Sequence, residues 1–429
     1  SALSWTCLLV VFVSTSSSPL PSFNIDPERI AVAGISSGAG FAMQFHVAFS
    51  SHFRGVGVFA GVPYRCAVTR FRKDVLYSCD ELPENRRGAG CAGSGRNWDP
   101  QQAPCDPSCP PGQGFYFAKC TGCAGAPSLP GVTAVNVSQL AEVIVQRGAA
   151  GLIDAPVNLA GQRAFIYRGA KDGCFQPGSV ENTANLYKLL LEPTDVKFES
   201  SVPSLHCIPT MNDGTPCGQE GNYTEVAPHG LEACGYDGAG ECLQHIFSGT
   251  LAPGIPQDLG SILPFNQTEF FDPQRGHPGL ADVGWLYVPS KCRAGAKCGL
   301  FAFFHGCGMA FASGQNSSTG QGFNLTYVKR AGFNEHGSPP TLPVARRVAL
   351  GVTLTLWVTV HRYAEANDMV VVYPQMGHWN WTDGSANCWD AEGMTGEDYA
   401  DASGLQMATM ARIMERLSGL SFTRNNIEG

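Results

Sequence analysis

A serine between two glycines ends the first apolar run of the chain. Residues 34 to 38 read GISSG, which matches G-x-S-x-G with Ser36 at its centre. A nucleophilic serine on a sharp strand-to-helix turn needs small residues on both sides, because a Cβ there collides with backbone. Chance produces the pattern roughly 0.4 times in a chain with 51 glycines, so a glycine-rich loop is the alternative. The apolar strand before it and the helix after it favour Ser36 as nucleophile, followed by the N–H of Ser37.

A serine hydroxyl is a weak nucleophile, so it needs a base, and the base needs an anion that fixes its tautomer. Asp172 follows an apolar strand that starts at residue 163, and His206 ends a strand predicted over 196–206. Loops at the carboxyl ends of neighbouring parallel strands converge, and the order serine, acid, histidine is that of the α/β-hydrolases. Weaker alternatives are Asp154 and Asp195 for the acid and His245 and His378 for the base.

Acyl transfer also requires two N–H donors directed at the oxyanion. The stretch FFHGC ends an apolar strand and offers the N–H of Cys307 beside that of Ser37, which leaves His305 a structural role. Such a loop normally precedes the nucleophile, whereas here it follows Ser36. The C-terminal half supplies this strand, the strand 368–375 and the helix 402–419, and the N-terminal strand is the natural next element. We therefore predict a circularly permuted α/β-hydrolase, with a mostly parallel central sheet and helices on both faces.

Composition places the chain among exported globular proteins. Its 429 residues are 44% apolar and only 15% charged, and the net charge of −8 leaves no basic face for nucleic acid or membrane. Seventeen dispersed cysteines indicate disulfides, and six sequons indicate N-glycosylation in a secretory pathway. The expected glycan sites are Asn136, Asn222, Asn266, Asn316, Asn324 and Asn380. We expect a secreted, extracellular monomer.

Three segments stand apart from the single hydrolase domain predicted over 19–429. Residues 1–18 contain a short apolar stretch followed by small residues, which we interpret as the remnant of a signal peptide. Residues 80–130 are rich in Cys, Gly and Pro and read as a disulfide-laced insertion, in which CTGC could alternatively be half of a zinc site. Residues 335–361 interrupt an otherwise smooth helix and strand, so we interpret them as a spurious or retained-intron insertion, or else a surface excursion.

Eight stretches together resemble the extracellular poly(3-hydroxybutyrate) depolymerases of the fungal, circularly permuted, single-domain type. They cover nearly the whole chain outside 80–130 and 335–361: LPSFNIDPERIAVAGISSGAG, GVFAGVPYRCA, LHCIPTMNDG, CGYDGAG, GWLYVPSKC, FFHGC, VVVYPQ and NCWDAEGMTGEDYADASGLQM. The resemblance implies a serine esterase without cofactor or metal, with Ser36, Asp172 and His206 as its triad. The implied substrate is a polyester, a polyhydroxyalkanoate or its oligomers. The alternatives are a feruloyl or acetyl-xylan carboxylesterase and a catalytically silent binding protein.

The same resemblance implies disulfides and one binding residue. The implied pairs are Cys66 with Cys79, Cys217 with Cys234, Cys292 with Cys298, and Cys307 with Cys388. Trp389 is implied as an aromatic residue of the substrate crevice, while Ala391 stands where the family often has a second tryptophan. A disulfide between Cys174 and Cys207, which flank the acid and the base, and two unrelated pairings both remain open. The cysteines left unassigned are Cys91, Cys105, Cys109, Cys120, Cys123, Cys174, Cys207 and Cys242.

Overall fold

The computed structural model describes most of the hydrolase domain predicted from the sequence. The described residues are 19–66, 135–173, 175, 177–219, 226–253, 260–307, 309, 363–377, 387–391, 393 and 395–422. The predicted signal-peptide remnant 1–18, the cysteine-rich insertion 80–130 and the segment 335–361 lie outside these ranges, so the interpretations of all three stay predictions.

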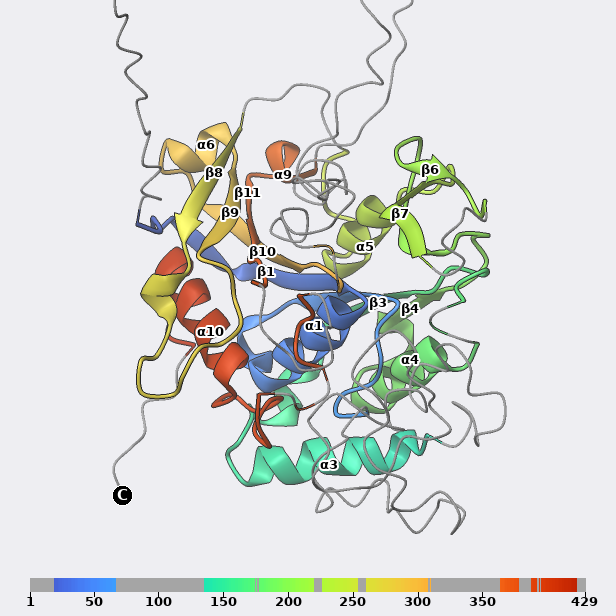
Figure 1. Ribbon diagram of the computed structural model, residues 1–429, viewed down its shortest axis with the longest axis horizontal. Helices are drawn as coiled ribbons and strands as arrows, with labels where there is room; N and C mark the ends of the chain where they lie inside the picture. Colours follow the sequence, from blue (N-terminus) through green and yellow to red (C-terminus); the bar gives the residue numbers. More distant parts are fainter. Residues whose placement is uncertain are drawn as a thin grey trace, which may run out of the picture.

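An eight-stranded sheet forms the centre of the molecule (Figure 1), in the order β4-β3-β2-β1-β10-β11-β9-β8. The six strands from β4 to β11 run parallel, and β9 and β8 complete the sheet in antiparallel pairing. The central parallel strands β2, β10 and β11 and the second half of β1 are apolar runs buried on both faces, as such sheets require, whereas the edge strand β4 is mostly half-buried. The strand bounds are β1 Ile25–Ile35, β2 Gly55–Phe59, β3 Arg163–Tyr167, β4 Val196–Glu199, β8 Ser261–Asn266, β9 Val283–Val288, β10 Cys298–Phe304 and β11 Met369–Tyr373.

Helices cover both faces of this sheet, which confirms the predicted fold class (Figure 1). One apolar core lies between the sheet and the helices α1 (Ser37–Ala48), α4 (Ser179–Leu190) and α10 (Leu405–Ser418), with α3 (Val137–Ala149) packed outside α4. A second core lies between the opposite face and the helices α5 (Gly238–Ile246) and α9 (Tyr363–Ala366). Short α6 (Ser290–Arg293) follows β9. The predicted apolar stripe of α10 lies in the first core: Met407, Met410, Ala411, Met414 and Leu417 are fully buried.

The two ends of the described chain meet, as a circular permutation requires. The N–H of Phe23, just before β1, donates to the carbonyl oxygen of Leu417 at the end of α10, at 2.9 Å. The β1 strand lies between β2 and β10, so the sheet is continuous across this junction. The elements β10, α9, β11, α10, β1 and α1 therefore follow one another in the structure in the order in which an unpermuted hydrolase has them along its chain.

The strand predicted to end at His206 is two separate strands, and this prediction was wrong. β4 ends at Glu199, the chain turns through Val202 and Pro203, and His206 begins β5 (His206–Thr210). Proline breaks the ladder because it lacks an N–H, and β5 joins a small parallel sheet of order β5-β7-β6. Its other strands are β6 (Thr215–Pro216) and β7 (Val226–Ala233). The helix after Ser36 also begins earlier than expected, at Ser37 rather than near Gly40.

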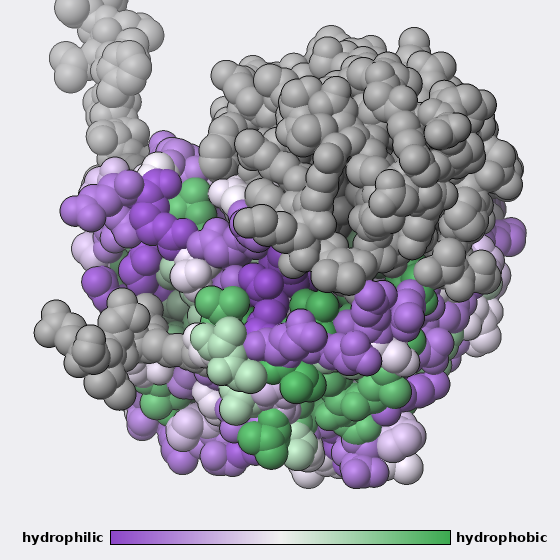
Figure 2. Space-filling model, turned by 90° about the horizontal axis from the view of Figure 1, so that it is seen from below, coloured by the Kyte–Doolittle hydropathy of each residue, from purple (hydrophilic) through white to green (hydrophobic). Residues whose placement is uncertain are grey.

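One face of the molecule exposes several apolar side chains. Figure 2 looks at the structure from the side on which α3 lies in Figure 1, and apolar residues appear there between polar ones. The exposed apolar residues of α3, α4 and the turns beside them are Val145, Leu152, Val157 and Leu189. None of the helices in the described ranges is long and apolar enough to cross a membrane. The sequon residue Asn136 is exposed and caps α3, and Asn266 is half-buried; the other four sequons lie outside the described residues.

A fully buried histidine links folding to pH. His46 of α1 contacts Tyr187 Oη at 3.0 Å and Gln162 Oε1 at 2.7 Å, and burial lowers its pKa to about 4. The folded state therefore binds fewer protons than the unfolded state between about pH 6.5 and 4. The contribution of neutral His46 to the free energy of unfolding is complete above pH 6.5 and falls by about 3 kcal/mol as the pH drops to 4.

Urea unfolding of the native chain and a His46→Asn variant at pH 7.5, 6 and 4.5 tests this linkage. Because other groups also titrate, the measured quantity is the difference in free energy of unfolding between the two proteins. We expect that difference to shrink with falling pH. A difference that is the same at all three pH values contradicts a neutral His46.

Candidate active site

Ser36 has a strained backbone. Its φ of 58° and ψ of −124° lie in a region that L-residues rarely occupy, and the residue directly precedes α1. Its N–H donates to the carbonyl oxygen of Phe59 in β2 at 2.9 Å, which fixes the turn to the neighbouring strand. The serine is half-buried at the carboxyl edge of the sheet. This is the geometry of a nucleophile on a strand-to-helix turn.

The glycines of GISSG are required by close backbone contacts. A Cβ on Gly34 would lie 2.3 Å from the carbonyl oxygen of Gly38, and a Cβ on Gly38 would lie 2.3 Å from the carbonyl oxygens of Phe304 and His305. Gly34 thus packs against the first turn of α1, and Gly38 packs that turn against the end of β10. The spacing of the motif follows from these two contacts.

Gly38→Ala is expected to damage both stability and activity. The Cβ meets backbone that cannot rotate away, so β10 or α1 must shift, at a cost of about 1–3 kcal/mol. A displacement of about 1 Å at the candidate nucleophile lowers kcat about 10²-fold. The control is Gly419→Ala, where φ is +71° but no atom lies within 4 Å, so only stability should fall. Thermal unfolding and ester hydrolysis measure the two effects; equal activity in both variants contradicts the prediction.

Asp172 and His206 form a buried pair. His206 Nδ1 lies 2.8 Å from Asp172 Oδ2, and the two side chains are 2% and 0% exposed. A carboxylate only accepts, so Nδ1 carries the proton and Nε2 remains an acceptor. Asp172 Oδ1 accepts the N–H of Phe175 at 2.8 Å, and the Phe175 ring stacks on the imidazole with 5.0 Å between centroids. Both oxygens of the carboxylate and the plane of the imidazole are therefore fixed.

The acid loop and the histidine segment are in direct backbone contact. A Cβ on Gly169 would lie 2.4 Å from the carbonyl oxygens of Ser204 and Leu205, so only glycine permits this approach. The N–H of Lys171 donates to the Ser204 carbonyl at 2.9 Å, and the Tyr167 and Ser204 hydroxyls are 2.6 Å apart. These contacts bring Asp172 and His206 together, although Asp172 follows a strand of the large sheet and His206 begins a strand of the small one.

The strand ends align the candidate residues at one edge. Gly34 pairs with Phe304, Ile35 with Phe59, and Phe59 with Tyr167, so the turns after β1, β10 and β3 leave the sheet at one level. The turn after β10 contacts the nucleophile directly, because a Cβ on Gly306 would lie 3.0 Å from the Cβ of Ser36. The N–H groups of Ser37 and Cys307 have no acceptor among the described residues. Within the described part of the chain, no carbonyl competes with an oxyanion for these two donors.

His305 has a structural role, as its position in the FFHGC motif suggested. Burial lowers its pKa to about 4, so the ring is neutral. Nδ1 lies 2.8 Å from the Gly306 carbonyl oxygen and Nε2 accepts the N–H of Met376 at 3.0 Å, which assigns the proton to Nδ1. With both nitrogens engaged, the histidine fixes the turn that carries Cys307.

Trp389 was predicted to line a crevice, and the structure contradicts this. Its side chain is fully buried and packs between Phe41 of α1 and Phe304 of β10, with ring centroids 4.6 and 4.9 Å apart. Cys388, the residue before Trp389, is bonded to Cys307 in the turn after β10, which places the Trp389 ring next to this strand. The Trp389 N–H donates to Ser37 Oγ at 3.3 Å. Trp389 therefore supports the turn from beneath.

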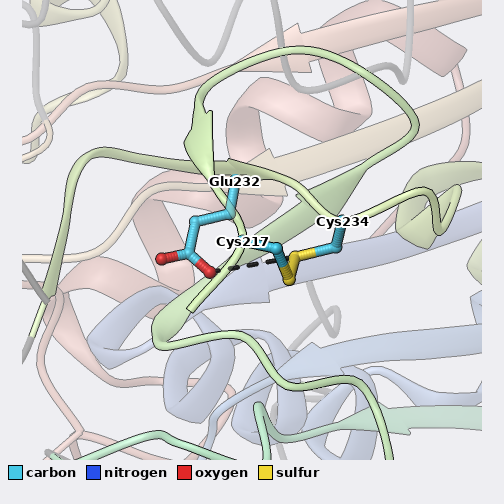
Figure 3. A group of neighbouring side chains, drawn as sticks. All are labelled: Cys217, Glu232 and Cys234. Carbon is cyan, nitrogen blue, oxygen red and sulfur yellow. Dashed lines mark hydrogen bonds between the residues drawn. A yellow bond between two sulfur atoms is a disulfide. The ribbon is translucent and has the colours of Figure 1, made fainter. Parts of the chain in front are cut away.

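Three of the implied disulfides are present in the described residues: Cys217–Cys234, Cys292–Cys298 and Cys307–Cys388. Cys66 is also disulfide-bonded, while Cys79 lies outside the described ranges. Cys207 and Cys242 are free and buried, so a Cys174–Cys207 bond is excluded. Burial raises the pKa of the Cys207 thiol, and the Glu232 carboxylate adds to the shift. Figure 3 shows Glu232 beside Cys217 and Cys234, whose sulfurs are bonded to each other and not available to a metal.

The alternative acids and bases lie elsewhere. Asp154 accepts from the N–H and hydroxyl of Ser51, and Asp195 forms an ion pair with Arg163 at 3.6 Å. His245 Nε2 contacts the Asp195 carbonyl oxygen at 2.9 Å. His378 lies outside the described residues. The contacts of Phe175 with Asp172 and His206, and of Gly169 with the segment before His206, were not predicted, since neither residue belongs to a motif.

Curated proteins similar to this chain carry one name. A poly(3-hydroxybutyrate) depolymerase of Delftia acidovorans is 26% identical over 404 residues, which are 93% of this chain and 61% of that protein. A polyhydroxybutyrate depolymerase of Talaromyces funiculosus is 25% identical over 416 residues, 93% of each chain. The chain is thus similar to polyhydroxybutyrate depolymerases over nearly its whole length. It spans less than two thirds of the Delftia protein's length.

Solved structures of PHB depolymerases share the fold. One is the enzyme from Penicillium funiculosum, and another is a serine-to-alanine variant in complex with an R3HB trimer. Each aligns with a TM-score of 0.62 at 22% identity, over 94% of this chain and 99% of the other. No family model matches the chain. The fold is thus common to this chain and these depolymerase structures.

Proposed function

We propose that this chain is an exported serine esterase that hydrolyses short-chain polyhydroxyalkanoates or their oligomers through an acyl-enzyme. The observation that carries the proposal is the strained Ser36 at the sheet edge where the Asp172 loop and the Cys307 turn also leave the sheet, with the buried His206 paired to Asp172. A metal or cofactor is not required by this set of groups. The disulfides support export into an oxidising compartment.

The mechanism follows from the tautomer of His206, which has its proton on Nδ1 toward Asp172. Nε2 accepts the Ser36 hydroxyl proton as Oγ attacks the ester carbonyl carbon, and the Ser37 and Cys307 N–H groups hold the resulting oxyanion. The imidazolium, stabilised by Asp172, then gives its proton to the leaving alcohol oxygen. Water attacks the acyl carbon as Nε2 takes its proton, the bond from the acyl carbon to Oγ breaks, and the imidazolium returns that proton to Ser36 Oγ as the carboxylic acid is released. No net proton or electron is left over.

The substrate class is supported by the similar proteins, which are named for polyhydroxybutyrate, and by the solved depolymerase structure in complex with an R3HB trimer. The test compares native protein on p-nitrophenyl butyrate, polyhydroxybutyrate film and feruloylated xylan. We expect hydrolysis of the first two. Activity on the soluble ester and xylan but none on film moves the assignment to a feruloyl or acetyl-xylan type esterase. Inactivity on all three substrates supports a catalytically silent binding protein.

A further inference from the structure

Glu232 is a buried carboxylate that the proposed mechanism does not use. It lies in β7, is completely buried, and its Oε2 accepts two backbone N–H groups, from Leu205 at 3.0 Å and from Gly218 at 3.1 Å. Its Oε1 has no partner among the described residues. Burying a carboxylate is costly, so two N–H bonds at one oxygen indicate a specific requirement at this place.

Leu205 directly precedes His206, and the strand ladder does not hold it. β5 begins at His206, so Leu205 lies outside its sheet hydrogen bonds, and the pairing of β5 with β7 is irregular between His206 and Ile208. Glu232 takes the Leu205 N–H in their place. On its other side, the Leu205 carbonyl packs against Gly169 of the acid loop. The residue before His206 is thus fixed between Glu232 and the loop that carries Asp172.

Gly218 completes the connection to the acid loop. It has a φ of +61°, and a Cβ there would lie 2.1 Å from the Pro203 carbonyl oxygen. Its carbonyl oxygen accepts from Lys171 Nζ at 3.2 Å, and Lys171 is the neighbour of Asp172. The Cys217–Cys234 disulfide joins the residues next to Gly218 and close to Glu232 (Figure 3). One carboxylate oxygen therefore connects the segments that carry both the acid and the base.

We propose that Glu232 is a positioning residue for His206: its Oε2 holds the Leu205 N–H and so sets the position of the imidazole against Asp172. The inference rests on the proposed esterase function, in which His206 is the base. Glu232 acts through the position of its acceptor oxygen, which lies within hydrogen-bond distance of the Leu205 N–H, and not through its charge. Gln can place its carbonyl oxygen where Oε2 lies, whereas Asp keeps the charge but is one methylene too short, and Met removes the acceptor.

The experiment measures kcat and KM on p-nitrophenyl butyrate for Glu232→Gln, Glu232→Asp and Glu232→Met. We expect Gln to retain most of kcat, and Asp and Met to lose about 10²-fold with KM nearly unchanged, since His206 is displaced while the substrate site is not. If Met does not fold, the Gln and Asp pair decides. Asp active with Gln inactive, or all three with native kcat, overturns the proposal.

Glu365→Met is the matched control. Glu365 is another buried carboxylate, which accepts from the N–H and hydroxyl of Ser290 and from the Tyr287 hydroxyl, in contact with α6 and β9. It should lose stability without loss of kcat in the folded protein. A kcat loss equal to that of Glu232→Met would mean that the Glu232 effect is general destabilisation, which overturns the proposal.

A second readout does not depend on activity. The far-downfield proton signal of His206 Nδ1–H, assigned by its loss in His206→Ala, reports the hydrogen bond to Asp172. We expect this signal to persist in Glu232→Gln and Glu365→Met and to shift or broaden in Glu232→Asp and Glu232→Met. An unchanged signal in all four variants overturns the proposal even where the native chain hydrolyses no ester. If the native protein hydrolyses no ester but the His206 signal changes as expected in the Glu232 variants, only the proposed esterase function is overturned.

Discussion

Ser36→Ala is expected to lower kcat on p-nitrophenyl butyrate about 10⁶-fold. Alanine removes the Oγ that forms the acyl bond but fits the same turn, where the backbone strain at φ 58° is already present. Binding of substrate should change little, so the loss is expected in kcat rather than in KM. Purified native and variant proteins with the same circular dichroism spectrum and thermal midpoint give the comparison.

Ser37→Ala is the internal control, because the two serines are neighbours in one motif. Among the described residues its hydroxyl accepts the Trp389 N–H, and the N–H that would bind the oxyanion stays in place. We expect a loss of no more than about tenfold, corresponding to one weakened hydrogen bond. If Ser37→Ala abolishes hydrolysis and Ser36→Ala retains it, the nucleophile has been assigned to the wrong serine.

Asp172→Asn is expected to lower kcat about 10⁴-fold. Oδ1 of Asp172 accepts the Phe175 N–H and Oδ2 accepts from His206 Nδ1, so each oxygen faces a donor. An asparagine that places its carbonyl oxygen toward Phe175 turns its NH₂ group toward Nδ1. The imidazole must then carry its proton on Nε2, the tautomer that cannot accept the Ser36 proton.

The controls for the acid are the two aspartates that the sequence also offered. Asp195→Asn and Asp154→Asn alter contacts with Arg163 and with Ser51, outside the set of groups around Ser36. Both variants should hydrolyse p-nitrophenyl butyrate at close to the native rate. A loss in Asp195→Asn comparable to that in Asp172→Asn would reassign the acid. Nitrogen chemical shifts of the His206 ring distinguish the two tautomers directly.

The fold class was predictable because it depends on local patterns and their order. Apolar runs of strand length, a helix with the Met407 stripe on one face, and G-x-S-x-G between strand and helix are each readable within about fifteen residues. The permutation followed from the order of these elements, because a loop that offers an oxyanion donor came after the serine. In the structure, the hydrogen bond from Phe23 to Leu417 brings the end of α10 to the start of β1, as the permutation predicts.

The surroundings of the candidate triad were only partly predictable. Asp172 and His206 were identified because both follow apolar runs, yet His206 begins a strand of the second sheet and does not end one of the first. A proline three residues before it was the available signal for the break. Trp389 was misplaced because the direction of a side chain beside a disulfide depends on what it packs against, here Phe41 and Phe304.

By itself the sequence determined the strand-to-helix turn at Ser36, the order of the elements and the candidates for nucleophile, acid and base. Tertiary structure alone decided that Cys207 is free, that Gly169 meets the histidine segment and that Glu232 holds Leu205. The physical reason is the range of the contacts involved. A strained turn and an apolar stripe are made by neighbours in the chain, whereas a buried carboxylate finds its partners 14 and 27 residues away, through packing that no local pattern encodes.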